Sequence, residues 1–312
     1  TSTSGDIVVT ADAAPADNVG VITDNTAAEA ANLVTTGTAT LTAATGIGGA
    51  AADADLDTTL GTVAATNSTS GDIYLQETNG LIVGGAGVRT QGGNGVVNID
   101  VDAGALTVNS VVTGDGSGSV TLNADAGTVT LAAAVSSTTG AIDITGDVIA
   151  QNAGGDVTTG GAGTVDVTAD AGSITMADGT TTTSGTGQIT YDASNDVALS
   201  LLTSTNGDIV VTADAAPADN VGAITDNTAP GEAANLVTTG TATLSAATGI
   251  GAVAGDADID TTLGNLIVSD NTTAGEVAVQ ETNTLIVNSV RQSAAAVTSI
   301  VVTAGDATVP SS

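Results

Sequence analysis

Apolar and polar residues alternate with a period of two along most of this chain. The segment 119–135 reads SVTLNADAGTVTLAAAV, with small apolar residues at every second position and hydroxyls, amides or acids between them. Such alternation predicts β-strands with one buried and one solvated face, separated by a glycine turn. The residues expected to face inward are Val120, Leu122, Ala124, Val129, Leu131 and Ala133.

The predicted strands recur at a regular interval. Their first apolar residues are spaced by roughly 22 residues, and the separation of Ile7 from Ile73 fits three such intervals. A repeat this short cannot bury its own apolar face and must stack on its neighbours. The spacing therefore predicts an all-β parallel β-helix (β-solenoid) with about 22 residues per coil, about 14 coils and no α-helix. The residues that mark the interval are Val97, Val120, Ile142, Val165, Ile189 and Ile209.

A second, longer repeat contains the first. GDIVVTADAAPADNVG at 5–20 recurs at 207–222, and the similarity continues to QETNGLIV and QETNTLIV. The long repeat of about 202 residues fits nine short intervals. We therefore expect one continuous solenoid over 1–312, made of the repeat 5–206 and the partial copy 207–312. The blocks 13–32 and 215–235 interrupt the alternation and are expected to form loops or irregular coils.

The composition removes most catalytic chemistry. The chain has no Cys, His, Trp, Phe or Lys, so triads, thiol nucleophiles, zinc sites of the usual type and Schiff bases have no candidate residue. With 34 acidic and 2 basic residues the net charge is -32, which repels nucleic acid and anionic lipid. No apolar stretch approaches the length of about 18 residues that indicates a membrane-spanning helix, so membrane insertion is not expected. The 41% apolar content is too high for a disordered acidic tail.

The tandem G-x-[VI]-x-[VL]-x-A units resemble the shafts of filamentous-haemagglutinin-like giant bacterial adhesins and exoproteins. The run ITDNTA…TATLTAATGIG…DLDTTLGT…TSGDIYLQET over 22–78 carries the same resemblance. It covers essentially the whole chain and implies a right-handed parallel β-helix, extracellular or at a bacterial cell surface. No secretion domain, translocator or receptor-binding module is recognisable, so the resemblance is to the shaft alone.

Two glycine-rich segments resemble the start of the calcium-binding G-G-x-G-x-D-x-U-x repeat. They are GGNGVVNI at 92–99 and GGAGTVDV at 160–167. The aspartate that should bind the ion is replaced by Val97 and Val165, respectively. We therefore expect no specific metal site and no cofactor, although divalent cations such as calcium could associate loosely with the acidic surface.

Closely spaced carboxylates raise the question of glycoside hydrolysis, which needs only a pair of them. Alternation is expected to place each set on one strand face, but no aromatic platform or basic subsite accompanies any set. We interpret them as solvated faces and assign no catalytic residue. The sets are Asp53/Asp55/Asp57, Asp100/Asp102 and Asp256/Asp258/Asp260.

Arg89 and Arg291 are repeat equivalents, each preceded by valine. Each is expected to form an ion pair with an aspartate of a neighbouring coil, or alternatively a contact between shafts. Threonine pairs at 36–38, 38–40 and 128–130 suggest an ice-binding ladder, but T-x-T does not recur once per coil.

The sequence thus favours a non-catalytic structural rod of an extracellular fibre, filament or adhesin stalk. Neither end of the chain carries an amphipathic capping helix, so we expect self-association by axial continuation or stacking, with lateral bundling in addition. The alternatives are an adhesive protein that binds a surface glycan or ice and, third, a β-helix enzyme that cleaves polysaccharide.

Overall fold

The computed structural model describes residues 1–12, 17–26, 30–51, 54–215, 220–228, 233–270, 275–292 and 296–310. Within these ranges the protein contains 26 β-strands and no helix. Parallel strands stack as a β-solenoid of about 11 turns, with equivalent positions about 23 residues apart. The predicted fold class is confirmed.

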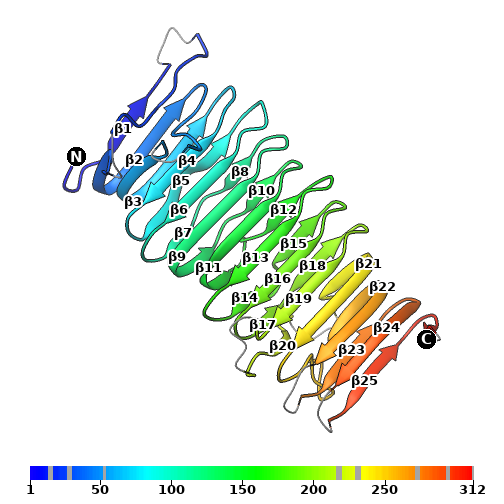
Figure 1. Cartoon of the computed structure of the whole chain (residues 1–312). Coiled ribbons are helices and arrows are strands. Elements are labelled where there is room, and N and C mark those ends of the chain that lie inside the picture. The colour runs from blue at the N-terminus through cyan, green and yellow to red at the C-terminus, as the bar shows by residue number, and fades with distance from the viewer. Residues whose placement is uncertain are drawn as a thin grey trace. The chain divides into compact units, whose positions relative to one another are not determined.

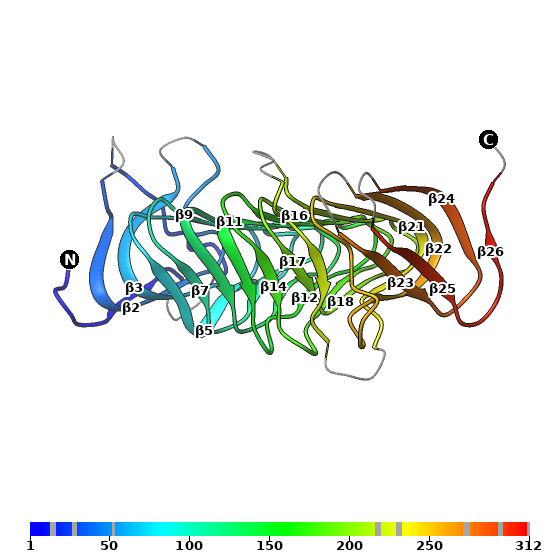
Figure 2. The ribbon, with the colours of Figure 1, turned by 90° about the horizontal axis from the view of Figure 1, so that it is seen from below.

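The chain forms two compact units, an N-terminal unit (Thr1–Asp147) and a C-terminal unit (Val148–Ser312). Figure 1 shows within each unit how strands of successive turns lie side by side, and Figure 2 shows the same turns from a perpendicular direction. The strands that begin in the N-terminal unit are β1 (Ile7–Thr10), β2 (Leu33–Ala43), β3 (Leu56–Asn67), β4 (Ile73–Glu77), β5 (Leu81–Thr90), β6 (Val97–Val101), β7 (Leu106–Val108), β8 (Val112–Gly114), β9 (Val120–Leu131), β10 (Val135–Ser137) and β11 (Ile142–Gln151).

The remaining strands belong to the C-terminal unit. They are β12 (Val157–Thr159), β13 (Val165–Ala169), β14 (Ile174–Met176), β15 (Thr181–Ser184), β16 (Ile189–Ala193), β17 (Val197–Leu199), β18 (Leu201–Ser204), β19 (Ile209–Ala213), β20 (Ile224–Asp226), β21 (Leu236–Ala246), β22 (Ile259–Asp270), β23 (Val277–Glu281), β24 (Leu285–Gln292), β25 (Thr298–Val302) and β26 (Ala307–Thr308).

Aliphatic side chains stack from turn to turn inside each unit, as the interval predicted. In the N-terminal unit Val97 of β6 pairs with Val120 of β9. The Val120 amide in turn donates to the carbonyl of Ala141 (2.9 Å), the residue just before β11. In the C-terminal unit Val165 pairs with Ile189, and Ile189 with Ile209. These valine and isoleucine side chains are fully buried. Burying a Val or Ile side chain contributes about 1.5–3 kcal/mol, so these columns are a main source of stability.

The interval between Ile7 and Ile73 was assigned wrongly. Ile7 of β1 pairs with Ala39 of β2, whereas Ile73 of β4 continues a different ladder, which begins at Ile22 and passes through Ile47. The two isoleucines therefore do not stack. The reason is a longer turn, because the ladder step from position 7 to position 39 spans more of the chain than the step from position 97 to position 120.

Long turns also explain why the solenoid has about 11 turns rather than about 14. In the C-terminal unit the ladder step from Ile209 to its partner Ala242 is similarly long. The blocks 13–32 and 215–235 supply the extra length and rejoin the ladders through Ile22 and through β20. Their expected irregularity is confirmed for the described part, while residues 13–16, 27–29, 216–219 and 229–232 lie outside it.

One corner of the turn is built from a buried hydroxyl and glycines. Ser137 Oγ donates to Gly118 O of the preceding turn (2.7 Å) and accepts the amide of Gly140 (2.9 Å). A Cβ on Gly118 would lie 1.9 Å from Gly95 O, and one on Gly140 would lie 2.2 Å from Gly118 O. Successive turns therefore approach so closely at this corner that only glycine fits.

The same corner recurs in the C-terminal unit. Ser204 Oγ donates to Gly187 O (3.1 Å) and accepts the Gly207 amide (3.0 Å). Thr238 Oγ1 then donates to Gly207 O (2.7 Å) and accepts the Gly240 amide (2.9 Å). These hydroxyls satisfy backbone groups that the corner would otherwise leave buried without partners.

A single aromatic side chain interrupts the aliphatic columns. Tyr191 of β16 is fully buried between its ladder partners Val167 and Val211. Its hydroxyl donates to Gln151 Oε1 (2.9 Å) and lies 2.6 Å from Thr182 Oγ1, and burial raises the pKa of Tyr191 above its ordinary value. The solenoid interior therefore accepts one tyrosine because polar partners inside the core satisfy its hydroxyl.

Candidate functional site

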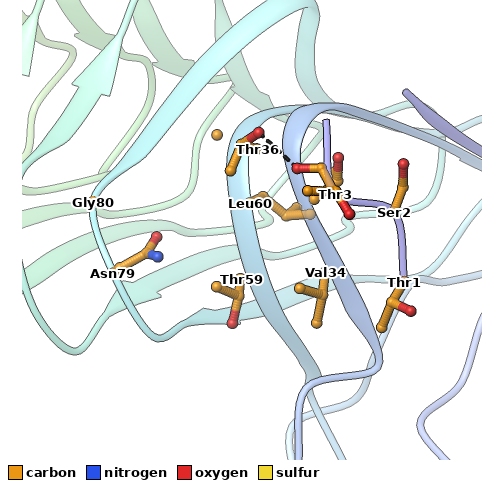
Figure 3. A pocket seen from close by; sticks show the side chains of 11 residues that line it. Thr1, Ser2, Thr3, Val34, Thr36, Thr59, Leu60, Asn79 and Gly80 are labelled. Carbon is orange, nitrogen blue, oxygen red and sulfur yellow. Dashed lines mark hydrogen bonds between the residues drawn. The ribbon is translucent and has the colours of Figure 1, made fainter. Parts of the chain in front are cut away.

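A groove of about 660 Å³ lies beside β2 and β3 in the N-terminal unit. Figure 3 shows threonine side chains of successive turns along it, with Asn79 at its far end. Thr36 Oγ1 donates to Thr3 O (2.9 Å), which is the dashed line in Figure 3. The lining residues are Thr1, Ser2, Thr3, Val34, Thr35, Thr36, Thr59, Leu60, Gly61, Asn79 and Gly80.

A groove of about 230 Å³ lies at the equivalent position of the C-terminal unit. Thr203, Ser204 and Thr205 correspond there to residues 1–3, and Asn283 corresponds to Asn79. The preceding turn adds Thr183 and Ser184 to the lining, and the other lining residues are Val237, Thr238, Thr239 and Thr262. The groove is thus a feature of the long repeat.

A break in the strand ladder shapes both grooves. The register between β2 and β3 shifts between Thr35 and Thr38, and the register between β21 and β22 shifts between Thr238 and Thr241. At the first break Thr35 Oγ1 donates to Gly5 O (2.7 Å) and accepts the Gly37 amide (3.0 Å). Such irregularities re-aim side chains, and here they turn Thr36 outward to the rim.

A buried carboxylate lies behind the groove of the N-terminal unit. Glu77 of β4 is 0% exposed and accepts bonds from Thr58 Oγ1 (2.7 Å), the Leu60 amide (2.9 Å) and the Asn79 amide (3.3 Å). Burial raises the pKa of Glu77, against the lowering effect of these donors. The donors occupy the carboxylate, so its role is to hold the corner of the turn.

Glu281 occupies the equivalent place in the C-terminal unit. It is also 0% exposed and accepts bonds from Thr261 Oγ1 (2.8 Å) and from the amides of Leu263 (3.1 Å) and Asn283 (3.0 Å). Sequence reasoning missed both glutamates because it assigned acids to the outer face. The signal available was the repeated QETN motif, in which this acid ends a strand.

The expectation that each acid triple lies on one strand face is wrong. Among the described members of the two triples, only Asp57 of β3 and Asp260 of β22 lie in strands. Both are buried, and their amides donate to Asn32 Oδ1 and Asn235 Oδ1, respectively (2.9 Å each). The first member of the N-terminal triple, Asp53, lies outside the described residues. Asp57 and Asp260 thus take part in corner networks with asparagine side chains of other turns.

Asp100 and Asp102 lie at the end of β6, but only Asp100 belongs to the strand. Asn123 Nδ2 donates to Asp100 Oδ1 (2.9 Å) and to Asp125 Oδ1 (2.6 Å), while Gln76 Nε2 donates to Asp102 Oδ1 (3.1 Å). Burial raises the pKa of Asp100, and the charges of Asp125 and Asp102 raise it further, against the Asn123 bond. Among the described residues no group of three or more acids is arranged to hold a metal ion.

Val97 and Val165, at the position of the calcium-binding aspartate, are buried core residues. They begin β6 and β13 and stack on the next turn. The glycines before them, such as Gly92 and Gly93 with φ of 76° and 85°, form the turn that leads into the strand. These segments are solenoid corners.

The two arginines occupy equivalent rows of outward side chains. Arg89 follows Thr66 and precedes Thr113 in its row, and Arg291 follows Ser269. Neither forms an ion pair with a described carboxylate, so the expected ion pairs are absent from this part of the chain. The reason is that the row neighbours are hydroxyls, and Arg89 Nη2 instead donates to Ala86 O.

Threonines stack from turn to turn, although not as the T-x-T pairs of the sequence. Thr10, Thr42 and Thr66 form a single outward row in the N-terminal unit, which Arg89 then interrupts. The row is visible only once the register is known, because the long turn between residues 7 and 39 hides its spacing.

No described segment forms a helix with the length and apolar character needed to cross a membrane. No family model matches the chain, and neither a curated protein nor a solved structure gives a significant match.

Proposed function

We propose that this chain is a non-catalytic structural segment of an extracellular fibre, filament or adhesin stalk. The observation that carries the proposal is the register-matched stacking of turns around an aliphatic core in each unit. In the C-terminal unit a single ladder passes through Val165, Ile189, Ile209, Ala242 and Leu266, all fully buried. Each added turn contributes a strand ladder and another layer of core, so stability grows with the number of turns.

The proposal includes association between copies, axially or laterally. The support is that both repeats build the same corner, since Thr35 donates to Gly5 O in one and Thr238 donates to Gly207 O in the other. A turn from one repeat could therefore stack on the turns that neighbour its equivalent in the other. The net charge of -32 keeps copies apart until divalent cations or a partner offset the repulsion. Those cations associate loosely with the acidic surface.

We place the protein outside the cell or at a bacterial surface. The support is the resemblance of its tandem units to filamentous-haemagglutinin-like shafts, together with a polar surface of Thr, Ser, Asp and Asn. This assignment rests on the sequence pattern.

Electron microscopy of the purified chain, with and without calcium, tests the structural role. We expect fibres one solenoid wide or bundles of them, and we expect chelator or high salt to loosen bundles held by ionic contacts. A monodisperse monomer under all of these conditions would contradict self-association.

A catalytic role is the competing class that acid pairs suggest. We expect no cleavage in a screen of acidic and neutral polysaccharides, because Asn and Gln side chains already bind Asp57, Asp100, Asp102 and Asp260. Cleavage that disappears in Asp100→Asn or Asp102→Asn would move the protein to the hydrolases. A binding role is favoured by a more specific observation, the groove that recurs in both units.

A further inference from the structure

A groove without charged side chains recurs once in each long repeat. Its wall is formed by Thr36 and Thr59 in the N-terminal unit and by Thr239 and Thr262 in the C-terminal unit. No charged side chain of the described residues lines either groove. In the C-terminal unit β15 and β18 of earlier turns border the groove, so it forms within a continuous run of turns.

Two threonine hydroxyls of the groove wall already donate their protons to the protein. Thr36 Oγ1 donates to Thr3 O and Thr239 Oγ1 donates to Thr205 O, both at 2.9 Å. A hydroxyl has one proton and two lone pairs, so these oxygens remain free only as acceptors. These two wall hydroxyls therefore offer acceptors to a ligand, while other lining hydroxyls, such as those of Thr3 and Thr205, donate to no described residue.

The asparagine at the groove end also offers a hydrogen-bond acceptor. The Asn79 amide group lies with Nδ2 donating to Glu77 Oε1 (2.8 Å) and Gly80 O (3.2 Å), which leaves Oδ1 as an acceptor. Its equivalent Asn283 has an Oδ1 atom that is buried without a hydrogen-bond partner. An unsatisfied buried acceptor is costly, and a ligand hydroxyl that donates to it after a small side-chain movement would remove that cost.

We propose that each groove binds a neutral, hydroxyl-rich glycan, a binding activity that goes beyond the structural role proposed above. The acceptors at Thr36, Thr239 and the two asparagines suit a ligand that donates hydrogen bonds, the remaining lining hydroxyls can donate to its oxygens, and the charge of -32 disfavours an anionic ligand. A cationic ligand would need a free carboxylate, but protein donors already occupy Glu77 and Glu281.

Apolar contacts in the groove suit the same ligand class. Threonine presents a methyl group beside its hydroxyl, and Val34 and Leu60 add aliphatic surface to the lining. The CH faces of a sugar ring can pack on these groups while its hydroxyls reach the acceptors. The groove crosses successive turns, which are about 4.8 Å apart, so a linear oligosaccharide can follow it.

The expected affinity is low for one groove. No aromatic platform contributes stacking, and volumes of about 660 and 230 Å³ accommodate only a few sugar units. Because the groove recurs with the long repeat, a polymeric glycan that engages several grooves would bind more tightly through avidity.

Saturation-transfer NMR on the whole chain tests this, with cellohexaose, mannohexaose and xylohexaose as probes. We expect transfer from at least one probe, with a Kd on the order of 1 mM per groove. Each isosteric Thr→Val change should weaken binding about fivefold by removing an acceptor. The groove variant combines Thr36→Val, Thr59→Val, Thr239→Val and Thr262→Val, and the control variant combines the exposed strand changes Thr158→Val and Thr175→Val.

The groove variant should lose the transfer, whereas the control should keep it, with both showing the wild-type circular dichroism spectrum. The proposal is overturned if no probe binds at about 10 mM, or if the groove variant binds as the wild type does. Salt-sensitive binding of spermine in place of the glycans would also overturn it and assign a cationic ligand. Fibre formation is read separately by microscopy, so failure of the structural role and failure of the groove are distinguishable.

Discussion

Replacing Gly118 by alanine should destabilise the N-terminal unit strongly, although glycine-to-alanine changes at compatible sites usually stabilise by about 0.4–1 kcal/mol. The new Cβ would lie 1.9 Å from Gly95 O and 2.5 Å from Gly95 C, both backbone atoms of the preceding turn. Reaching a tolerable separation of 3.0 Å requires the two turns to move apart by about 1.1 Å.

That movement would break hydrogen bonds between the turns. The Val97 amide donates to Ser119 O at 2.9 Å and the Ser117 amide donates to Asn94 Oδ1 at 3.0 Å, and both bonds join these two turns close to residue 118. Losing two or three such bonds at about 1 kcal/mol each, and loosening the core beneath them, gives about 3–5 kcal/mol.

Urea unfolding followed by circular dichroism measures the effect, and hydrogen exchange with mass spectrometry locates it in the turn that contains residue 118. Gly49→Ala is the matched control in the same unit, because its Cβ would meet nothing closer than Ala54 Cβ at 3.5 Å and its φ is not positive. If Gly118→Ala leaves the urea midpoint equal to or above that of the wild type, the close stacking of turns at this corner is wrong.

Three further changes test other parts of the structure. Ser204→Ala should lower the free energy of unfolding by about 1–3 kcal/mol, because the Gly207 amide loses its acceptor, and urea unfolding measures this. Tyr191→Phe should cost about 1–2 kcal/mol by leaving Gln151 Oε1 without its donor, and an unchanged melting temperature would contradict that polar contact. The urea midpoint should rise as the pH falls from 7.5 toward about 4.5, since a raised folded-state pKa for Glu77 means that the folded chain takes up a proton before the unfolded chain does. A midpoint that falls over this range would contradict the raised pKa.

The ladder partners were predictable wherever the turn length is constant. Val97 and Val120, and Val165 and Ile189, are paired as the interval indicates, because strict alternation leaves one register that buries the apolar face. The prediction failed for Ile7 and Ile73. Alternation shows whether a residue faces inward or outward, but it does not show how many residues a loop adds to a turn.

The buried acids were not predictable from alternation. Glu77 and Asp57 occupy positions where burial depends on backbone amides and amide side chains of other turns. The sequence shows these residues as ordinary acids, and only the register brings their partners to them. The groove escaped prediction for the same reason, since Thr3, Thr36 and Thr59 lie in different turns.

The central claim is that the structural role rests on turns stacked in one fixed register, and a disulfide test addresses it most directly, since the chain has no native cysteine. Thr190 and Val210 are ladder partners on the outer face of β16 and β19, whereas Thr190 and Thr212 are two positions out of register. Neighbouring strands lie about 4.8 Å apart, within disulfide reach, while the offset pair lies at about 8 Å, beyond it. We predict that Thr190→Cys with Val210→Cys oxidises to an intramolecular disulfide, seen by mass spectrometry, and that Thr190→Cys with Thr212→Cys does not. A disulfide in the offset pair with none in the matched pair would contradict the register.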